Sequence, residues 1–270
     1  MSFVELKNAN YGYNKSFHLS NLSFDISQGM FAGIIGPNGS GKSTLLKGIT
    51  GELSVSENQV FLKGKDLGTL LENERAKEIA VVTQFSEPID ITVEEFVLMG
   101  RIPYRKKYQF FENDGDFEIA QKYMKLTDTY HLKGKKFSNL SGGEQQLANI
   151  AKALTQEPSL LLLDEPTSHL DISHQVEILN LIQELTHELG LTVIMVIHDL
   201  NLASEYCDYL ILMNEGTLYK HGTPNEILNF KNIEEVYNTL VVTQNNPLSK
   251  KPSIFLVSNK ILKNSNKSIK

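Results

Sequence analysis

The sequence predicts an α/β fold built around a parallel sheet, and three observations indicate this class. Two continuous apolar runs, SLLLLDE at residues 159–165 and LTVIMVIHD at residues 191–199, are typical of strands buried on both faces. Between them, residues 174–190 place apolar side chains at helical spacing and end in Gly190, where a helix C-terminal cap belongs. A strand, a helix and a strand in this order predict a βαβ unit and therefore parallel strands.

The region before this unit also alternates between predicted strands and helices. Its first eighty residues alternate β-branched and aromatic runs with Asn, Gly and Ser, which predicts strands. KSTLLKGIT then predicts a helix that ends at Gly51. Residues 58–67 predict a strand and a turn, and IAVVTQ at residues 79–84 predicts another short strand.

Residues 86–140 have a helical pattern, which starts with a capping-box sequence formed by Thr92 and Glu95. We expect an inserted helical subdomain here. The single domain would span residues 1–245, with a core made of residues 1–85 and 141–245. The end of the chain is rich in Asn, Ser and Lys, so we expect a frayed C-terminal tail over residues 246–270.

The composition excludes several classes of protein. The 270 residues include 32 acidic and 26 basic side chains, a net charge of -6 that gives no support for nucleic-acid binding. The single cysteine, Cys207, excludes a disulfide framework and fits a reducing compartment. The start of the chain has no secretory-signal pattern, and the longest apolar runs are too short to span a membrane. We expect a soluble protein that can dock on a membrane protein.

The segment GPNGSGKST lies between a predicted strand and a predicted helix, which is the context that a phosphate-binding P-loop requires. Its glycines allow backbone N–H groups to turn toward a phosphate, and the helix adds the positive end of its dipole. Lys42 is expected to reach the β- and γ-phosphates and Ser43 to ligate Mg²⁺. The candidate binding residues are Gly36, Pro37, Asn38, Gly39, Ser40, Gly41, Lys42, Ser43 and Thr44.

Polar side chains end three of the predicted strands: Gln84, the pair Asp164 and Glu165, and His198. In open α/β sheets the ligand lies beyond the carboxyl ends of the strands, so these side chains are expected beside the P-loop. Asp164 is the candidate Mg²⁺ partner and Glu165 the candidate base for the attacking water. Gln84 is expected to contact the metal or the water, and His198 the γ-phosphate.

A second glycine-rich stretch, FSNLSGGEQQ at residues 137–146, opens a predicted helix. It is either a turn with a helix cap or a second contact to phosphate. The N-terminus of a helix offers free N–H donors, and glycines add little bulk. A cap explains Ser141 but leaves both Gly142 and Gly143 unexplained.

These motifs together resemble the ATP-binding subunit of ABC transporters, from residue 1 to about residue 245. The resemblance implies a P-loop NTPase core with a parallel sheet, an N-terminal antiparallel β subdomain and an inserted α-helical subdomain. Six segments carry it in order: GPNGSGKST as Walker A, Gln84 as the Q-loop, LSGGEQQ as the signature, LLLLDEP as Walker B, SHLD as the D-loop and His198 as the switch histidine.

The resemblance implies a head-to-tail homodimer that holds ATP between the Walker A loop of one subunit and the signature of the other. Ser141, Gly142 and Gly143 would contact the γ-phosphate across that dimer. Asp171 of the D-loop would contact the partner subunit. Tyr13 would stack on adenine as the A-loop aromatic; Tyr11 is the competing choice, and packing within the sheet is the alternative for either.

TVEEFVLMGRIPY and PTSHLDISHQVEIL are most similar to the ATPases of importers for iron-siderophore, haem and vitamin B12. The implied partners are two transmembrane permease subunits and, indirectly, a substrate-binding protein, with no nucleic acid. The implied location is the cytoplasmic face of the cell membrane. Importers of zinc, manganese or molybdate and non-transport ABC ATPases are the alternatives. The sequence departs from the family after the signature, where Gln145, Gln146 and Leu147 stand in place of the usual basic residue.

Overall fold

The structure is a computed structural model, and it describes residues 2–13, 17–53, 57–83, 89–106 and 112–258. Its centre is a six-stranded sheet in the order β10-β9-β3-β8-β7-β6. Strands β9, β3, β8, β7 and β6 are parallel, and β10 pairs with β9 in the antiparallel sense. The bounds are β3 (Phe31–Ile35), β6 (Ile79–Val82), β7 (Leu160–Asp164), β8 (Thr192–Val196), β9 (Tyr209–Asn214) and β10 (Thr217–Gly222). The predicted α/β class is confirmed.

Both faces of this sheet are covered. Along β7, Leu161 and Leu163 belong to one apolar cluster and Leu160 and Leu162 to another, because successive strand side chains point to opposite faces. This explains the uninterrupted leucine run. The first face carries α5 (Gly142–Thr155), α6 (Ile172–His187) and α7 (Leu200–Tyr206); the second carries α1 (Lys42–Thr50) and an antiparallel sheet.

The antiparallel sheet has the order β2-β1-β4-β5 and is formed by the N-terminal part of the chain. Its strands are β1 (Ser2–Tyr13), β2 (Phe17–Ser27), β4 (Val60–Leu62) and β5 (Lys65–Asp66). Buried side chains of β1, β2 and β4 join the cluster that covers the second face of the central sheet. The predicted antiparallel β subdomain is therefore present.

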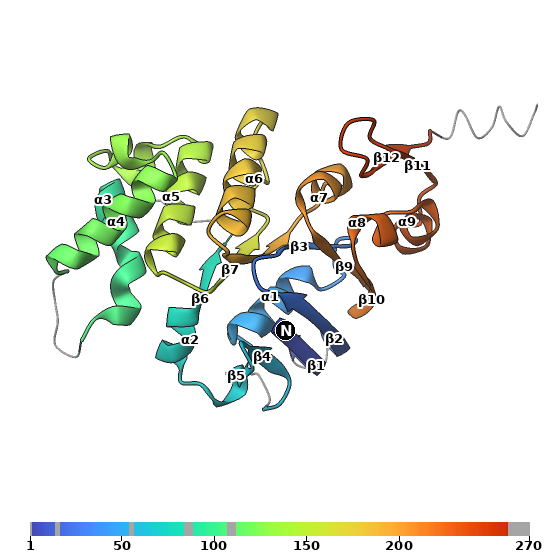
Figure 1. Cartoon of the computed structure of the whole chain (residues 1–270), viewed down its shortest axis with the longest axis horizontal. Coiled ribbons are helices and arrows are strands. Elements are labelled where there is room, and N and C mark those ends of the chain that lie inside the picture. The colour runs from blue at the N-terminus through green and yellow to red at the C-terminus, as the bar shows by residue number, and fades with distance from the viewer. Residues whose placement is uncertain (1, 14–16, 54–56, 84–88, 107–111, 259–270) are drawn as a thin grey trace, which may run out of the picture.

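Helices dominate the segment between β6 and β7, and α3, α4 and α5 gather at one end of the molecule (Figure 1). The expected capping box starts α3, since the Thr92 amide donates to Glu95 Oε2 at 2.7 Å and the Glu95 amide donates to Thr92 Oγ1 at 3.2 Å. Phe96 and Phe137 stack in the core of this region with ring centroids 4.0 Å apart. The helices of this segment are α3 (Val93–Leu98) and α4 (Asp114–Leu126), with the 3₁₀ turns η3 (Met99–Tyr104), η4 (Tyr130–Leu132) and η5 (Phe137–Asn139), whereas η2 (Leu67–Thr69) and α2 (Glu72–Glu78) precede β6.

Arg101 of η3 ties this helical region to the end of α5. Its buried guanidinium donates to Asp116 at 3.0 Å, to Glu157 at 3.0 Å and to the Thr155 carbonyl at 2.9 Å. A cation at the C-terminus of a helix also interacts favourably with the helix dipole. This network fixes the far end of α5, although the usual basic residue near the start of that helix is missing.

We expect Arg101→Ala to lower the free energy of unfolding by about 3 to 5 kcal/mol, because Asp116 would remain as a buried carboxylate without its partner. Urea denaturation measures this change. The matched control is Arg105→Ala, which removes a pair with Glu112 nearer the surface and should cost no more than about 1 kcal/mol. Equal losses for the two variants would contradict this role of Arg101.

The expected frayed tail covers residues 246–270, of which 259–270 lie outside the described residues and 246–258 include a strand. Strands β11 (Val241–Asn245) and β12 (Pro252–Leu256) form a hairpin that follows α8 (Pro224–Ile227) and α9 (Phe230–Tyr237). Two side chains of α7 hold the hairpin. Ser204 Oγ donates to the Pro252 carbonyl at 2.6 Å, and the Ile254 amide donates to Asn201 Oδ1 at 2.8 Å. The polar composition suggested fraying, but these side-chain bonds satisfy the backbone of β12.

Candidate nucleotide site

The P-loop connects β3 to α1, and its glycines occupy conformations that other residues rarely adopt. Gly39 and Gly41 have φ angles of 79° and 102°. Gly36 has a φ of 149°, and a Cβ atom there would lie 2.3 Å from the Met213 carbonyl oxygen. A loop of this shape turns its backbone amides toward a ligand in front of the α1 N-terminus, which favours an anion.

Lys42, the first residue of α1, is buried, with 6% of its surface exposed. Its ammonium donates to the carbonyl oxygens of Gly36 at 2.9 Å and Pro37 at 3.0 Å. Burial lowers the pKa of Lys42, while Glu165 and Asp164 oppose that shift. The ammonium has lost much of its water and is held by neutral carbonyls, so an incoming phosphate would be a better partner.

Ser43 and Asp164 meet as expected at the carboxyl end of β7. Ser43 Oγ donates to Asp164 Oδ1 at 3.0 Å. Burial raises the pKa of Asp164, although the Ser43 hydroxyl bond opposes the shift. A cation would stabilise the charged form of this carboxylate. Two oxygen donors beside a phosphate loop fit Mg²⁺, which keeps several waters and takes its remaining ligands from phosphates.

Glu165 lies next to this pair with a left-handed backbone (φ 52°) and two side-chain partners. One carboxylate oxygen accepts a bond from Ser168 Oγ at 3.1 Å, and the other contacts His198 Nε2. His198 was expected at the γ-phosphate, and its Nε2 lies against the candidate base. A carboxylate held at both oxygens has a fixed orientation.

A cleft of about 450 Å³ opens in front of these groups, a size that suits a small-molecule ligand. Ser40 and Pro37 do not line it: Ser40 is buried within the loop, and its hydroxyl has no hydrogen-bond partner among the described residues. The cleft is lined by Asn38, Gly39, Gly41, Lys42, Ser43, Thr44 and Glu165.

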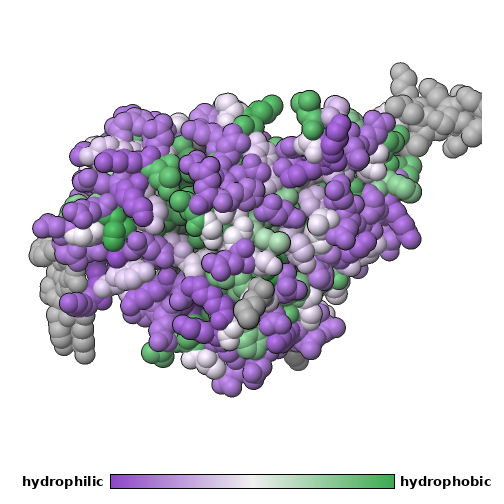
Figure 2. Space-filling view, viewed as in Figure 1, coloured by the Kyte–Doolittle hydropathy of each residue, from purple (hydrophilic) through white to green (hydrophobic). Residues whose placement is uncertain are grey.

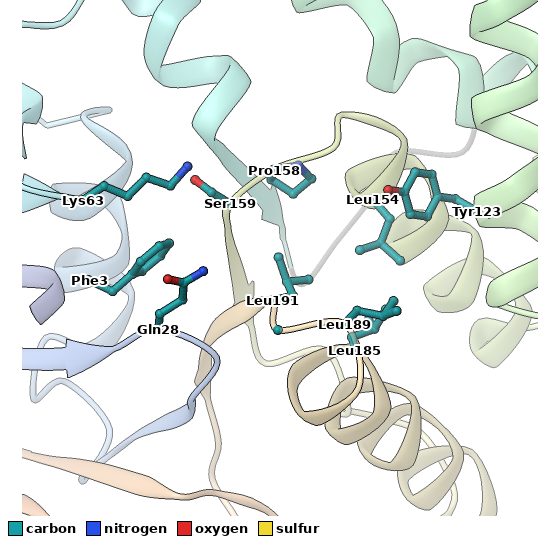
Figure 3. A pocket seen from close by; sticks show the side chains of 11 residues that line it. Phe3, Gln28, Lys63, Tyr123, Leu154, Pro158, Ser159, Leu185, Leu189 and Leu191 are labelled. Atoms are coloured by element: carbon teal, nitrogen blue, oxygen red, sulfur yellow. The ribbon is translucent and has the colours of Figure 1, made fainter. Parts of the chain in front are cut away.

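A second pocket, of about 210 Å³, lies at the opposite ends of the strands, where Gln28, Ser159 and Leu191 precede β3, β7 and β8 (Figure 3). Leucine side chains from α5, from α6 and from the loop between α6 and β8 form much of its wall. Its basic residue, Lys63, is paired with Glu78 at 2.8 Å. Because none of the candidate phosphate ligands reaches this pocket, we assign the nucleotide to the P-loop cleft.

The signature stretch starts α5 as expected. Ser141 is the N-cap: its hydroxyl accepts from the Glu144 amide at 3.3 Å, and its own amide donates to Glu144 Oε2 at 2.7 Å. The two glycines differ. A Cβ atom on Gly142 would meet only Leu170, at 3.5 Å, whereas one on Gly143 would lie 2.3 Å from the His174 ring. Packing within the subunit therefore explains Gly143, and the argument for a phosphate contact rests on Gly142.

Two candidates fall partly or wholly outside the described residues. Gln84 lies outside them. Tyr13 ends β1, and its side chain is not among those described. Its competitor Tyr11 is 3% exposed and lies against Gly48, where a Cβ atom would be 2.5 Å from the ring. Tyr11 packs in the core and has no free face for adenine.

The model of the ABC transporter family matches residues 19–168, more than half of the chain. The chain belongs to the ABC transporter family. The resemblance found in the motifs is confirmed, and with it the prediction of a nucleotide-binding ATPase cassette.

Two curated relatives of this ABC protein are named for the transport of ferric enterobactin and of petrobactin. The ferric enterobactin transport ATP-binding protein FepC of Escherichia coli is 38% identical over 244 residues, which cover 90% of each chain. The petrobactin import ATP-binding protein FpuC of Bacillus anthracis is 38% identical over 228 residues, which cover 84% of each chain.

Solved structures agree with the cassette fold. An inward-facing metal-chelate type ABC transporter aligns with a TM-score of 0.84 and 26% identity, covering 97% of this ABC protein and 100% of the matched chain. The dimeric bacterial cassette MJ0796 aligns with a TM-score of 0.70 and 29% identity, covering 82% and 98% of the two chains. A cassette of the same family thus forms dimers.

Among the described helices, none has the length and apolar character of a membrane span. Polar side chains cover most of the face in Figure 2.

Sequence reasoning missed two side chains near the site. Ser168 was part of the Walker B and D-loop sequence, but its bond to Glu165 depends on the turn in which the Ser168 amide donates to the Glu165 carbonyl at 3.1 Å. His174 looked like an ordinary residue of a helix, and only the packing of α6 against the start of α5 brings it to Gly143.

Proposed function

We propose that this protein is the ATP-hydrolysing subunit of an importer for an iron chelate, with siderophores the leading substrate class. One observation supports ATP hydrolysis most directly. Lys42, the Ser43–Asp164 pair and Glu165 converge beside the P-loop cleft. The names of the relatives and of the metal-chelate transporter support the substrate class. Haem and cobalamin are the other two substrates of the importer group that the motifs resemble.

The binding step would use the P-loop and Lys42. The amides of the loop and the α1 N-terminus would hold the phosphates, and the Lys42 ammonium would exchange its bonds to carbonyls for bonds to the β- and γ-phosphates. Ser43 and Asp164 would hold Mg²⁺, with Gln84 beside it; when bound, the ion would neutralise charge on the transferred phosphoryl group. Tyr13 would stack on the adenine.

Glu165 would act as the general base. A carboxylate needs one free lone pair to take a proton from water, and His198 and Ser168 orient it from the two sides. The contact with His198 would loosen as nucleotide enters, which would leave that Glu165 oxygen for the water and let His198 turn toward the γ-phosphate.

The signature would complete a second subunit's site. Gly142 is exposed at the start of α5, where the capping box uses the amides of Ser141 and Glu144 and leaves those of Gly142 and Gly143 for a ligand. Two chains would close head to tail around two ATP molecules, with Ser141, Gly142 and Gly143 of each facing the ATP of the other. Hydrolysis would reopen the dimer and drive two permease subunits, which receive substrate from a binding protein. The protein would sit at the cytoplasmic face of the membrane and bind no nucleic acid.

We expect cells that lack this subunit to lose uptake of radioactive iron supplied as a ferric siderophore. Wild-type protein and His187→Ala, a change on the exposed part of α6, should restore uptake. Lys42→Ala should not, because the phosphate contacts of the ammonium would be lost. Uptake of haem, cobalamin, zinc, manganese and molybdate is measured in parallel. Normal iron uptake with loss of zinc or manganese uptake would contradict the proposed substrate class.

A further inference from the structure

The first turn of α6 lies between two segments that the proposed function places at different ATP molecules. One is the signature at the start of α5, which would serve the partner's ATP. The other is the D-loop, residues 168–171, which follows the base Glu165 of the subunit's own site. In one subunit these segments lie side by side, since Leu170 is 3.5 Å from where a Gly142 Cβ would be.

His174 makes the central contact. Its Nδ1 lies 2.8 Å from Asp171 Oδ1, and its backbone amide donates to the same oxygen at 3.0 Å. The Ser173 hydroxyl donates there as well, at 2.7 Å. The opposite side of the ring lies on Gly143, so close that a Cβ atom would be 2.3 Å from Cδ2 and 2.9 Å from Nε2. The ring is therefore wedged between the D-loop and the signature.

The next residue continues this path toward the catalytic carboxylate. Gln175 Nε2 donates to the carbonyl oxygens of Thr167 at 3.2 Å and Leu170 at 3.1 Å. Between these two positions, Ser168 Oγ donates to Glu165 Oε2 at 3.1 Å. Hydrogen bonds and peptide links thus connect Asp171 with Glu165, and the His174 ring extends this path to Gly143.

We propose that His174 is a positioning residue that couples the two ATP sites of the dimer by joining the signature and the D-loop of one subunit. The inference rests on the proposed function, because only in a head-to-tail dimer do the two ends of this path meet different ATP molecules. When the signature engages or releases the partner's ATP, the His174 ring follows Gly143 and moves Asp171. The D-loop then shifts Ser168 and with it the orientation of Glu165.

The contact itself is tested in the nucleotide-free protein by a double-mutant cycle on thermal stability. Gly143→Ala should lower Tm by about 4 °C, because the methyl group collides with a ring that Asp171 holds in place. In a His174→Ala background the same change should have little effect, because alanine is favoured in a helix. Equal shifts in both backgrounds would show that the ring does not press on Gly143 and would overturn the proposal.

The coupling is tested by the ATP dependence of hydrolysis with Mg²⁺. Wild-type protein should show a Hill coefficient above 1, with a limit of 2 for two sites, and His174→Ala should lower it to about 1. His187→Ala is the matched control: it removes a histidine that also contacts an aspartate, Asp208 at 3.2 Å, at the other end of α6. The control should keep the wild-type Hill coefficient.

His174→Asn keeps a donor near Asp171 but has no ring over Gly143, so we expect it to behave like His174→Ala. A wild-type Hill coefficient in either variant, or a fall in rate with unchanged cooperativity, would overturn the coupling role. A wild-type protein without cooperativity would overturn it too. Failure of the proposed function looks different, because wild-type protein would then not hydrolyse ATP at all.

Discussion

Glu165→Gln is expected to reduce ATP hydrolysis by about 10²- to 10⁴-fold, the range typical of a general base, while ATP binding is retained. Glutamine has the size of glutamate and tolerates the left-handed backbone at this position equally well. Its amide can keep contacts with Ser168 and His198, but it cannot accept a proton from water. The variant should therefore collect in an ATP-bound dimer, which size-exclusion chromatography with light scattering would detect.

The matched control for this variant is Ser168→Ala, which leaves the carboxylate and removes one of its partners. Because a single hydrogen bond contributes about 0.5 to 1.5 kcal/mol, we expect hydrolysis to fall by no more than about tenfold. A Glu165→Gln protein that hydrolyses ATP at the wild-type rate would contradict the role of Glu165 as base. A larger effect of Ser168→Ala than of Glu165→Gln would do the same.

Much of the site was predictable because it depends on local chemistry and on the topology of a parallel sheet. The P-loop needs glycines at positions fixed by its own turn, so GPNGSGKST identifies it without knowledge of its surroundings. The carboxyl ends of parallel strands meet at one edge, which explains why Asp164 and Ser43, far apart in sequence, lie 3.0 Å from each other.

The remainder depends on packing between distant segments, which sequence spacing does not encode. The two signature glycines looked equivalent, yet only Gly143 is covered by the His174 ring. Glu165 and His198 follow the neighbouring parallel strands β7 and β8, but their direct contact depends on side-chain rotamers. The hairpin β11–β12 was missed because its bonds to α7 come from Asn201 and Ser204, which gave no signal in the sequence.

Gly142→Asp is expected to abolish ATP-dependent dimerisation while the monomer still folds and binds nucleotide. Gly142 is exposed at the first position of α5, where an added Cβ atom meets only Leu170 at ordinary contact distance. An acidic side chain in the first turn of a helix is favourable, so the free energy of unfolding should not fall. In the proposed dimer, however, the new carboxylate would face the partner's γ-phosphate.

Like charges brought together at an interface cost several kcal/mol, so the dimer should weaken by at least about a hundredfold. Analytical ultracentrifugation with ATP in a Glu165→Gln background would measure this. Gly134→Asp is the matched control, because Gly134 is also exposed, with no atom near the position of its Cβ, and receives the same charge. The control should still dimerise. If Gly142→Asp dimerised as well, the signature would be only a helix cap, because a charge that does not disturb the dimer cannot lie against a phosphate.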